Sequence, residues 1–295
     1  MAASTRVVIS TVGPYAKYGS ELLAACAKSG THYCDLAAEA HWIRLMIDTH
    51  AAEAERTGAR IVHACGMDSI PSDLGVAVLQ QAARERFGGP CSHVRMRVTE
   101  MSGGFSGGTA GAMLHGFEAG KDDPTIRQGM IEPYFLCPEG QRDGPEPLGQ
   151  LMSVTVEYDE DLQAWVKPFF MGPMNTKIVR RTNAILDYPY GEDFRYEEAR
   201  LVGDGWSGRL RAHAEALAFG AFGLDGAGVR VTQSPLGDVD VMGTPVGHLA
   251  ARVFEPPAEV AVAPLRRVGH LGALAQPEVP IEFGRRLRRF PGAAA

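Results

Sequence analysis

Residues 61–74, which read IVHACGMDSIPSDL, decide the fold of the sequence around them. The stretch opens as a short apolar run and stops at Gly66, as a buried strand entering a turn does. A helix start follows at once, because Asp68 or Ser69 can serve as N-cap and Pro71 falls in the first turn. Open α/β sheets present polar groups in this way at their carboxyl edge, where ligands bind. Whether Asp68 and Ser69 cap the helix or face a ligand stays open at this stage.

Strands and helices alternate in the N-terminal part of the chain. We predict strands at residues 6–11, 31–36 and 60–65, and helices at residues 21–29, 40–57 and 72–86. The β-branched run at 6–11 is typical of a strand covered on both faces, and residues 12–19 (VGPYAKYG) are expected to form a loop. Because this spacing builds right-handed βαβ crossovers, it predicts an α/β fold with a parallel sheet, similar to half of a doubly wound dinucleotide-binding domain.

Composition excludes several classes of protein. The 295 residues have room for one large or two ordinary domains, and the net charge of −6 argues against nucleic acid as the main partner. The five cysteines show neither a CxxC pair nor zinc-type spacing, which indicates free thiols in a reducing compartment. His41 and His50 are too far apart for a helical metal-ligand pair, so no metal site is expected. No signal peptide or membrane span is found, and a cytoplasmic location is therefore expected.

The character of the sequence changes after residue 92. Residues 93–98 alternate as in a strand with one face in solvent, and a helix is predicted at 110–119 with Thr109 as a candidate N-cap. The glycine-dense segment before this helix lets backbone N–H groups approach a ligand or serves as a hinge between domains. We expect a loop or linker at 121–150 and a strand at 151–158.

Three further segments have competing interpretations. The aromatic stretch 165–174 could line an apolar pocket or pack as a core loop, and Arg180–Arg181 could hold a phosphate or be solvated. The G-x-G-x-x-G match at 203–208 follows a charged segment and contains a bulky Trp206, so we interpret it as a surface turn. Beyond residue 222 the chain loses periodicity, and only weak strand signals remain at 229–232 and 239–242.

Several separated motifs resemble one family of proteins. These are TVGPYAKYG, ACAKSGTHYCDL, the long segment that ends in GMDSIPSDLGV, SGGFSGGT, RRTNAIL and DYPYGEDFRYEEA. Over residues 5–222 they closely resemble the saccharopine dehydrogenase-like oxidoreductases, and within them the trans-acting enoyl reductases that work beside polyketide synthases in envelope lipid synthesis.

The resemblance implies an architecture. It gives a partial Rossmann-like domain at residues 1–92, an α+β substrate domain at 93–222 and an irregular tail at 223–295. It further implies NADP(H) as cofactor and a lipid-like enoyl substrate. A homo-oligomer, a partner synthase and peripheral membrane association are all compatible with it.

The resemblance also assigns site residues. Gly13, Pro14 and Tyr15 match the loop along the ribose and nicotinamide, and the turn beside the nicotinamide matches Gly66, Asp68, Ser69 and Pro71. The start of the substrate domain matches Ser106, Gly107, Gly108 and Thr109. Tyr15 or Asp68 would donate or relay a proton, although packing or capping explains each equally well.

The sequence departs from the family in two places. The glycine-rich phosphate turn and its surrounding strands are not found before residue 6, and the family's C-terminal segment is not recognisable after residue 222. The first departure predicts an uncovered apolar edge strand at residues 7–10 and an NADP affinity weakened by several kcal/mol.

Two functions are therefore compared, an NADP-dependent oxidoreductase and a truncated, non-catalytic fragment or binding subunit of such an enzyme. A hydrolytic alternative would use Ser69 with His63 and Asp68, but it lacks G-x-S-x-G.

Overall fold

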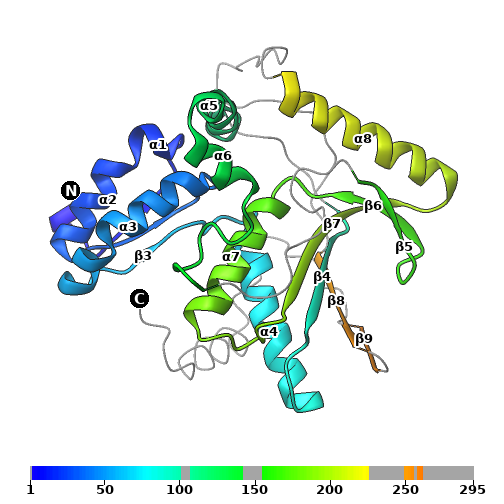
Figure 1. Ribbon diagram of the computed structural model, residues 1–295. Coiled ribbons are helices and arrows are strands. Elements are labelled where there is room, and N and C mark those ends of the chain that lie inside the picture. The colour runs from blue at the N-terminus through cyan, green and yellow to red at the C-terminus, as the bar shows by residue number, and fades with distance from the viewer. Residues whose placement is uncertain (1, 101–106, 142–154, 226–248, 256–257, 262–295) are drawn as a thin grey trace.

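The computed structural model describes residues 2–100, 107–141, 155–225, 249–255 and 258–261 (Figure 1). Of the strand predicted at 151–158, residues 151–154 lie outside these residues and the last two form part of a strand at 157–159; the weak strand signals at 229–232 and 239–242 also lie outside them. Two sheets are present, one with three strands and one with six. The mixed α/β architecture that the sequence predicts is confirmed, whereas the divisions at residues 92 and 222 stay predictions.

The N-terminal sheet is parallel, with the strand order β1-β2-β3. Its strands are β1 (Val7–Ser10), β2 (His32–Asp35) and β3 (Ile61–Val62), all within the predicted segments. A 3-10 turn (Ala2–Ser4) precedes β1, and the connections carry α1 (Tyr15–Tyr18), α2 (Ser20–Ser29) and α3 (Ala40–Thr57). The predicted bounds of α3 agree with the structure, because an apolar face and the left-handed Gly58 (φ 76°) define the helix and its end. The loop expected at 12–19 is wrong where the one-turn helix α1 forms.

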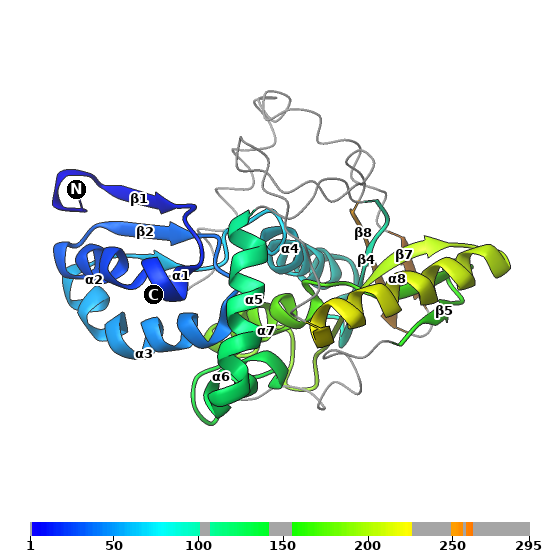
Figure 2. The ribbon, with the colours of Figure 1, turned by 90° about the horizontal axis from the view of Figure 1, so that it is seen from above.

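Within the described part of the chain, no helix covers one face of this sheet. Val7, Ile9 and Val62 are 48%, 70% and 51% exposed, and the strand register places them on the same face. The opposite face carries Tyr33 and Asp35, which are buried. The expectation that β1 is covered on both faces is therefore wrong, and β1 lies at the outer edge of the sheet (Figure 2).

The second sheet has the order β5-β6-β7-β4-β8-β9, in which only β4 and β7 run parallel. Its strands are β4 (His93–Val98), β5 (Glu157–Asp159), β6 (Ala164–Pro168), β7 (Arg195–Gly203), β8 (Leu249–Glu255) and β9 (Ala258–Ala261). The last two strands lie in the region where the sequence predicted no regular structure. They pair onto β4 and onto each other through backbone ladders, which local periodicity does not reveal.

Four longer helices and one short helix complete the described chain. They are α4 (Ile70–Phe87), α5 (Gly107–Asp122), α6 (Pro124–Ile131), α7 (Gly172–Ile185) and α8 (Gly205–Asp225). Helices α4 and α7 contribute Val76 and Val179 to a core with Met96 and Tyr196 of the sheet. The linker expected at 121–150 is wrong where α6 forms, because the Asp123 side chain accepts from two backbone N–H groups and caps that helix.

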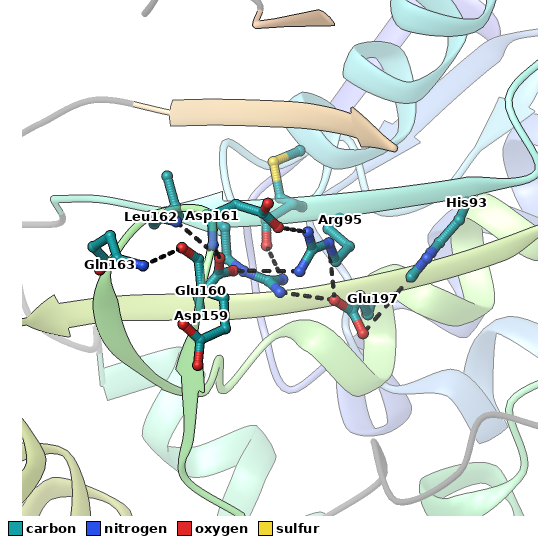
Figure 3. A network of polar contacts seen from close by, with 10 residues as sticks. His93, Arg95, Asp159, Glu160, Asp161, Leu162, Gln163 and Glu197 are labelled. Carbon is teal, nitrogen blue, oxygen red and sulfur yellow. Dashed lines mark hydrogen bonds and ion pairs between the residues drawn. The ribbon is translucent and has the colours of Figure 1, made fainter. Parts of the chain in front are cut away.

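The other face of β4 carries a network of ion pairs (Figure 3). Arg97 donates to Asp159 (Nε–Oδ2, 2.8 Å) and to Glu197 (Nη2–Oε1, 2.7 Å), while Arg95 pairs with Asp161. Arg97 is buried, and the carboxylates around it raise its pKa even though burial opposes this. The expectation that this face lies in solvent is therefore wrong for Arg97, whose charge is neutralised by two carboxylates.

Candidate functional site

The hydroxyl of Tyr15 lies where two parallel strands end. It donates to the carbonyl oxygen of Ser10 at the end of β1 (2.9 Å) and accepts from the backbone N–H of Leu36 just after β2 (3.1 Å). Burial is the main cause of the raised pKa of Tyr15, and the carboxylates of Asp35 and Glu39 add to it. Tyr15 therefore joins two strand ends, with its donor and one acceptor position in use.

A carboxylate from a distant part of the sequence caps α1. Glu39 accepts from the backbone N–H groups of Tyr15 (2.7 Å) and Ala16 (3.1 Å), whereas Pro14 at the N-cap position makes no side-chain cap. A negative charge is favourable at a helix N-terminus, where unpaired N–H groups gather. These two N–H groups are thus satisfied by Glu39. Sequence reasoning missed Glu39 because it is 24 residues from Tyr15.

Asp35 and His63 form a buried pair beside the ends of β2 and β3. Asp35 Oδ2 lies 2.7 Å from His63 Nδ1, and Asp35 Oδ1 accepts from the N–H groups of Ala37 and Ala64, each at 3.0 Å. Ala64 has a left-handed backbone (φ 56°), which turns the chain toward this carboxylate. His63 is therefore paired with Asp35 and not with Asp68, so the hydrolytic alternative finds no support in this geometry.

The turn between β3 and α4 brings a carboxylate against a glycine. A Cβ on Gly66 would overlap Asp68 Oδ1, so a larger residue at position 66 would force the Asp68 carboxylate to move. Ser69 occupies the N-cap position of α4 but makes no side-chain cap, and Pro71 lies in the first turn as predicted. A capping role for the Ser69 side chain is therefore wrong. Asp68, in the same turn, has a pKa that burial raises.

A cavity of about 280 Å³ opens at this edge of the parallel sheet. Its walls come from the strand ends and the turns after them, from α5 and α6, and from the segment that begins α7. The lining includes Thr11, Gly13, Tyr15, Leu36, His41, Asp68, Met113, Phe117, Met130, Phe170, Met171, Met174 and Lys177. Most of these side chains are apolar, and the few polar groups converge on them as in small-molecule sites.

The structure brings together only part of the predicted site. Gly13, Tyr15 and Asp68 line the cavity. Four other predicted residues do not line it and lie close to these three in the sequence: Pro14, Gly66, Ser69 and Pro71. Three other predicted residues, Gly107, Gly108 and Thr109, are the first residues of α5, so Thr109 lies within the helix and is not its N-cap. Ser106 lies outside the described residues.

Several residues of the cavity have no counterpart in the predicted site. They are Met113 and Phe117 of α5, Met130 of α6, His41 of α3 and Lys177 of α7. Burial lowers the pKa of His41, against the opposing effect of Glu39. The spacing of Met171, Met174 and Lys177, three residues apart on one helical face, is the signal that could have identified the lysine. The aromatic stretch 165–174 does line the cavity, through Phe170, Met171 and Met174, and it also packs in the core.

Two other candidates lie away from the cavity. Arg180 is buried and donates to the Tyr134 hydroxyl (3.0 Å), and Arg181 donates to the carbonyl oxygen of Leu136 (2.7 Å). Neither solvation nor phosphate binding therefore accounts for this basic pair. The segment 203–208 runs from the last residue of β7 into the first turn of α8, so the surface turn predicted there is wrong for residues 205–208, although Trp206 is 80% exposed. Among the described residues, no group of three His, Cys, Asp or Glu side chains is arranged to hold a metal ion.

The described cysteines are all free thiols, and three of them are buried. A search of the helices in the described part of the chain finds none with the length and apolar character of a membrane span.

Comparison with curated proteins finds trans-acting enoyl reductases among the relatives of this chain. A putative trans-acting enoyl reductase of Mycobacterium tuberculosis is 45% identical over 206 residues, which are 69% of this chain and 49% of the relative. The trans-acting enoyl reductases of Mycobacterium ulcerans and Mycobacterium leprae are 37% and 36% identical over 231 residues, which are 76% of this chain and 55% of each relative. No protein-family model and no solved structure matches. The chain spans about half the length of these curated relatives, and over that span it is similar to trans-acting enoyl reductases.

Proposed function

We propose that the chain belongs to an NADP-dependent enoyl reductase of the saccharopine dehydrogenase-like family, which reduces a lipid or polyketide-type enoyl substrate. The single observation that carries this proposal is the apolar cavity at the carboxyl edge of the parallel sheet, in a chain similar to trans-acting enoyl reductases. Ligands of α/β proteins bind at that edge.

The lining of the cavity supports a lipid-like substrate. Methionine and phenylalanine side chains of α5, α6, α7 and the segment just before α7 contribute to its wall, and their flexible or flat surfaces suit an alkyl chain. A volume of about 280 Å³ has room for part of such a chain together with a flat ring. A partner synthase would supply this enoyl substrate.

The residues beside the cavity fit the nicotinamide end of the cofactor. Gly13 lets a ring approach the backbone closely, and Asp68 offers a carboxylate for a carboxamide N–H. These residues do not explain how the pyrophosphate would bind, because Glu39 already accepts hydrogen bonds from the N–H groups at the start of α1. The described residues therefore account for one end of NADP(H) and not for its phosphates.

The chemistry divides between cofactor and protein. The bound nicotinamide would supply hydride, as it does in other enzymes that use it. The chain itself would orient the enoyl group between the Gly13 loop and α7 and exclude water through its apolar wall. Asp68, whose pKa is raised by burial, would take up or release a proton at its carboxylate.

Isothermal titration with NADPH tests this function directly. We expect binding in the micromolar range for the unchanged chain and weaker binding for Gly13→Val, because the added side chain would fill the approach to the backbone. A Val12→Ile change at the neighbouring position, which is exposed and does not line the cavity, is the matched control. Absence of binding up to millimolar NADPH would contradict the proposal.

A binding subunit is the second candidate function, and the uncovered face of the parallel sheet favours it. Parallel sheets are normally covered on both faces, and here Val7, Ile9 and Val62 stand exposed on one of them. A separate polypeptide that covers this face would complete the domain. NADPH binding only after such a partner is added would favour this candidate over the self-sufficient enzyme.

A further inference from the structure

Lys177 is a buried cation in the wall of the apolar cavity. Its side chain is 2% exposed, and its Nζ donates to the carbonyl oxygens of Met130 (3.1 Å) and Pro173 (3.0 Å). Met130 lies at the end of α6, where carbonyl groups lack partners within the helix and a positive charge is favourable. The two backbone groups therefore fix the position of the ammonium against the cavity.

An ammonium group has three N–H donors, and two of those of Lys177 are used. Within the described part of the chain, no ion pair or further hydrogen bond involves Nζ, and Glu132 acts on it only through space. Burial lowers the pKa of Lys177 to about 8. A buried donor without a partner is unfavourable, so this position suits a ligand that brings an acceptor.

The surroundings limit the kind of acceptor. Met171, Met174 and Phe170 line the same cavity as Lys177, and so do Met113 and Phe117 of α5. An uncharged oxygen at the end of an apolar chain satisfies both the donor and this lining. A charged ligand would have to lose its hydration in a mainly apolar cavity.

We infer that Lys177 binds the carbonyl oxygen of an acyl substrate and directs its double bond toward the Gly13–Tyr15 side of the cavity. This inference rests on the proposed function for its reaction. When hydride adds to the β carbon, the π electron pair moves toward the carbonyl oxygen and forms an enolate, which Lys177 stabilises. Transfer of the Asp68 carboxyl proton to the α carbon, the role that the proposed function gives that residue, completes the reduction.

The test is a cycle that varies the protein and the ligand together. The variants are Lys177→Met and the control Lys167→Met, since Lys167 of β6 pairs with Glu215 of α8 and does not line the cavity. The probes are a medium-chain 2-enoyl thioester of N-acetylcysteamine and the 2-alkenyl thioether of equal length, which keeps the acetamide but has no carbonyl group next to the double bond. Calorimetry measures the binding of each probe to each protein.

We expect Lys177→Met to weaken thioester binding by about 10- to 100-fold, as loss of a charged hydrogen bond does, and to leave thioether binding unchanged. Lys167→Met should alter neither. A purely structural tether between α6 and α7 would weaken both probes equally, and this outcome would overturn the inference. So would a wild-type protein that binds neither probe.

A measurement on the wild-type protein covers the case in which Lys177→Met does not fold. Reductive methylation of amines, followed by mass spectrometry, should be slowed at Lys177 by the thioester and not by the thioether. Equal protection by both probes, or by neither, would contradict the inference. NADPH titration of the same samples separates the two ideas: thioester selectivity without NADPH binding keeps the role of Lys177 and rejects the proposed function. NADPH binding without thioester selectivity keeps the proposed function and rejects the role of Lys177.

Discussion

At the scale of single residues, Tyr15 stabilises the site through its hydroxyl group. The hydroxyl joins Ser10 to Leu36, so Tyr15→Phe removes one donor and one acceptor and leaves their partners at a buried edge. We expect a loss of about 1–3 kcal/mol in the free energy of unfolding, measured by urea denaturation.

Tyr18→Phe is the matched control for this change. Tyr18 lies on the same short helix, but it is exposed, so its substitution should leave the unfolding free energy within about 0.5 kcal/mol. Equal stability of Tyr15→Phe and wild type would show that the two hydrogen bonds contribute nothing to the fold.

The site could be predicted only in part at this scale. Gly13, Tyr15 and Asp68 follow from a resemblance carried by local motifs, and all three line the cavity. Glu39 could not be predicted, because the N–H groups that it caps are distant in sequence. The spacing of Met171, Met174 and Lys177 could have indicated the lysine, but not its contact with α6. The contact of Lys177 with Met130, for example, spans 47 residues.

At the scale of elements, a buried polar network connects α4, α7 and β7. Asn175 donates to the backbone oxygen of Asp68 (2.8 Å), to Ser72 Oγ (3.1 Å) and to Glu198 Oε1 (3.2 Å). Tyr196 donates to the other oxygen of Glu198 (3.0 Å). The network therefore holds the turn that carries Asp68 against two other elements.

This network makes stability depend on pH. Burial raises the pKa of Glu198 from 4.5 to about 7, against the opposing hydrogen bonds from Asn175, Tyr196 and Ser72. Because the folded state favours the protonated acid, the stabilising contribution is complete below pH 4.5 and is lost as pH rises through about 7. Burial shifts Asp73 in the same direction, to about 6.

We therefore expect the free energy of unfolding to fall by about 3 kcal/mol or more between pH 4.5 and 7.5, and Glu198→Gln to remove much of that fall. Chemical denaturation at several pH values measures it. Glu160→Gln, at an exposed position of the β5–β6 turn, should keep the wild-type dependence. An unchanged slope in Glu198→Gln would exclude Glu198 as the titrating group.

Elements with strong local signals were predicted well. The apolar face of α3 and the glycine that directly follows the helix are both visible in the local sequence, and the structure agrees with both. Helix α1 is a single turn held by Glu39, and β8 exists through its pairing with β4, so each depends on a distant partner. Such elements have no hydrophobic periodicity of their own, so a sequence pattern cannot predict them.

At the scale of the whole molecule, the alternation of strands and helices was sufficient to predict that the strands of the first sheet run parallel. The sequence also indicated an uncovered edge at residues 7–10. It did not indicate that a whole face would be exposed, because a continuous apolar run is typical of a strand covered on both faces. Which face a helix covers is decided by the crossovers and not by the strand.

The exposed face predicts association between molecules. Val7, Ile9 and Val62 form an apolar surface next to the open edge of β1, and such surfaces pair or aggregate unless something covers them. Ile9→Lys should reduce concentration-dependent self-association, measured by sedimentation velocity. The unfolding free energy of the monomer should change by less than about 0.5 kcal/mol, because Ile9 is largely exposed.

Leu45→Lys provides the comparison that isolates the face. Leu45 is an exposed apolar residue of α3, away from the uncovered strands, so its change to lysine adds the same charge without altering the sheet. If both variants reduce association equally, net charge is the cause and the sheet face is not. If Ile9→Lys alone reduces it, the face that parallel sheets normally bury is the surface through which this molecule associates.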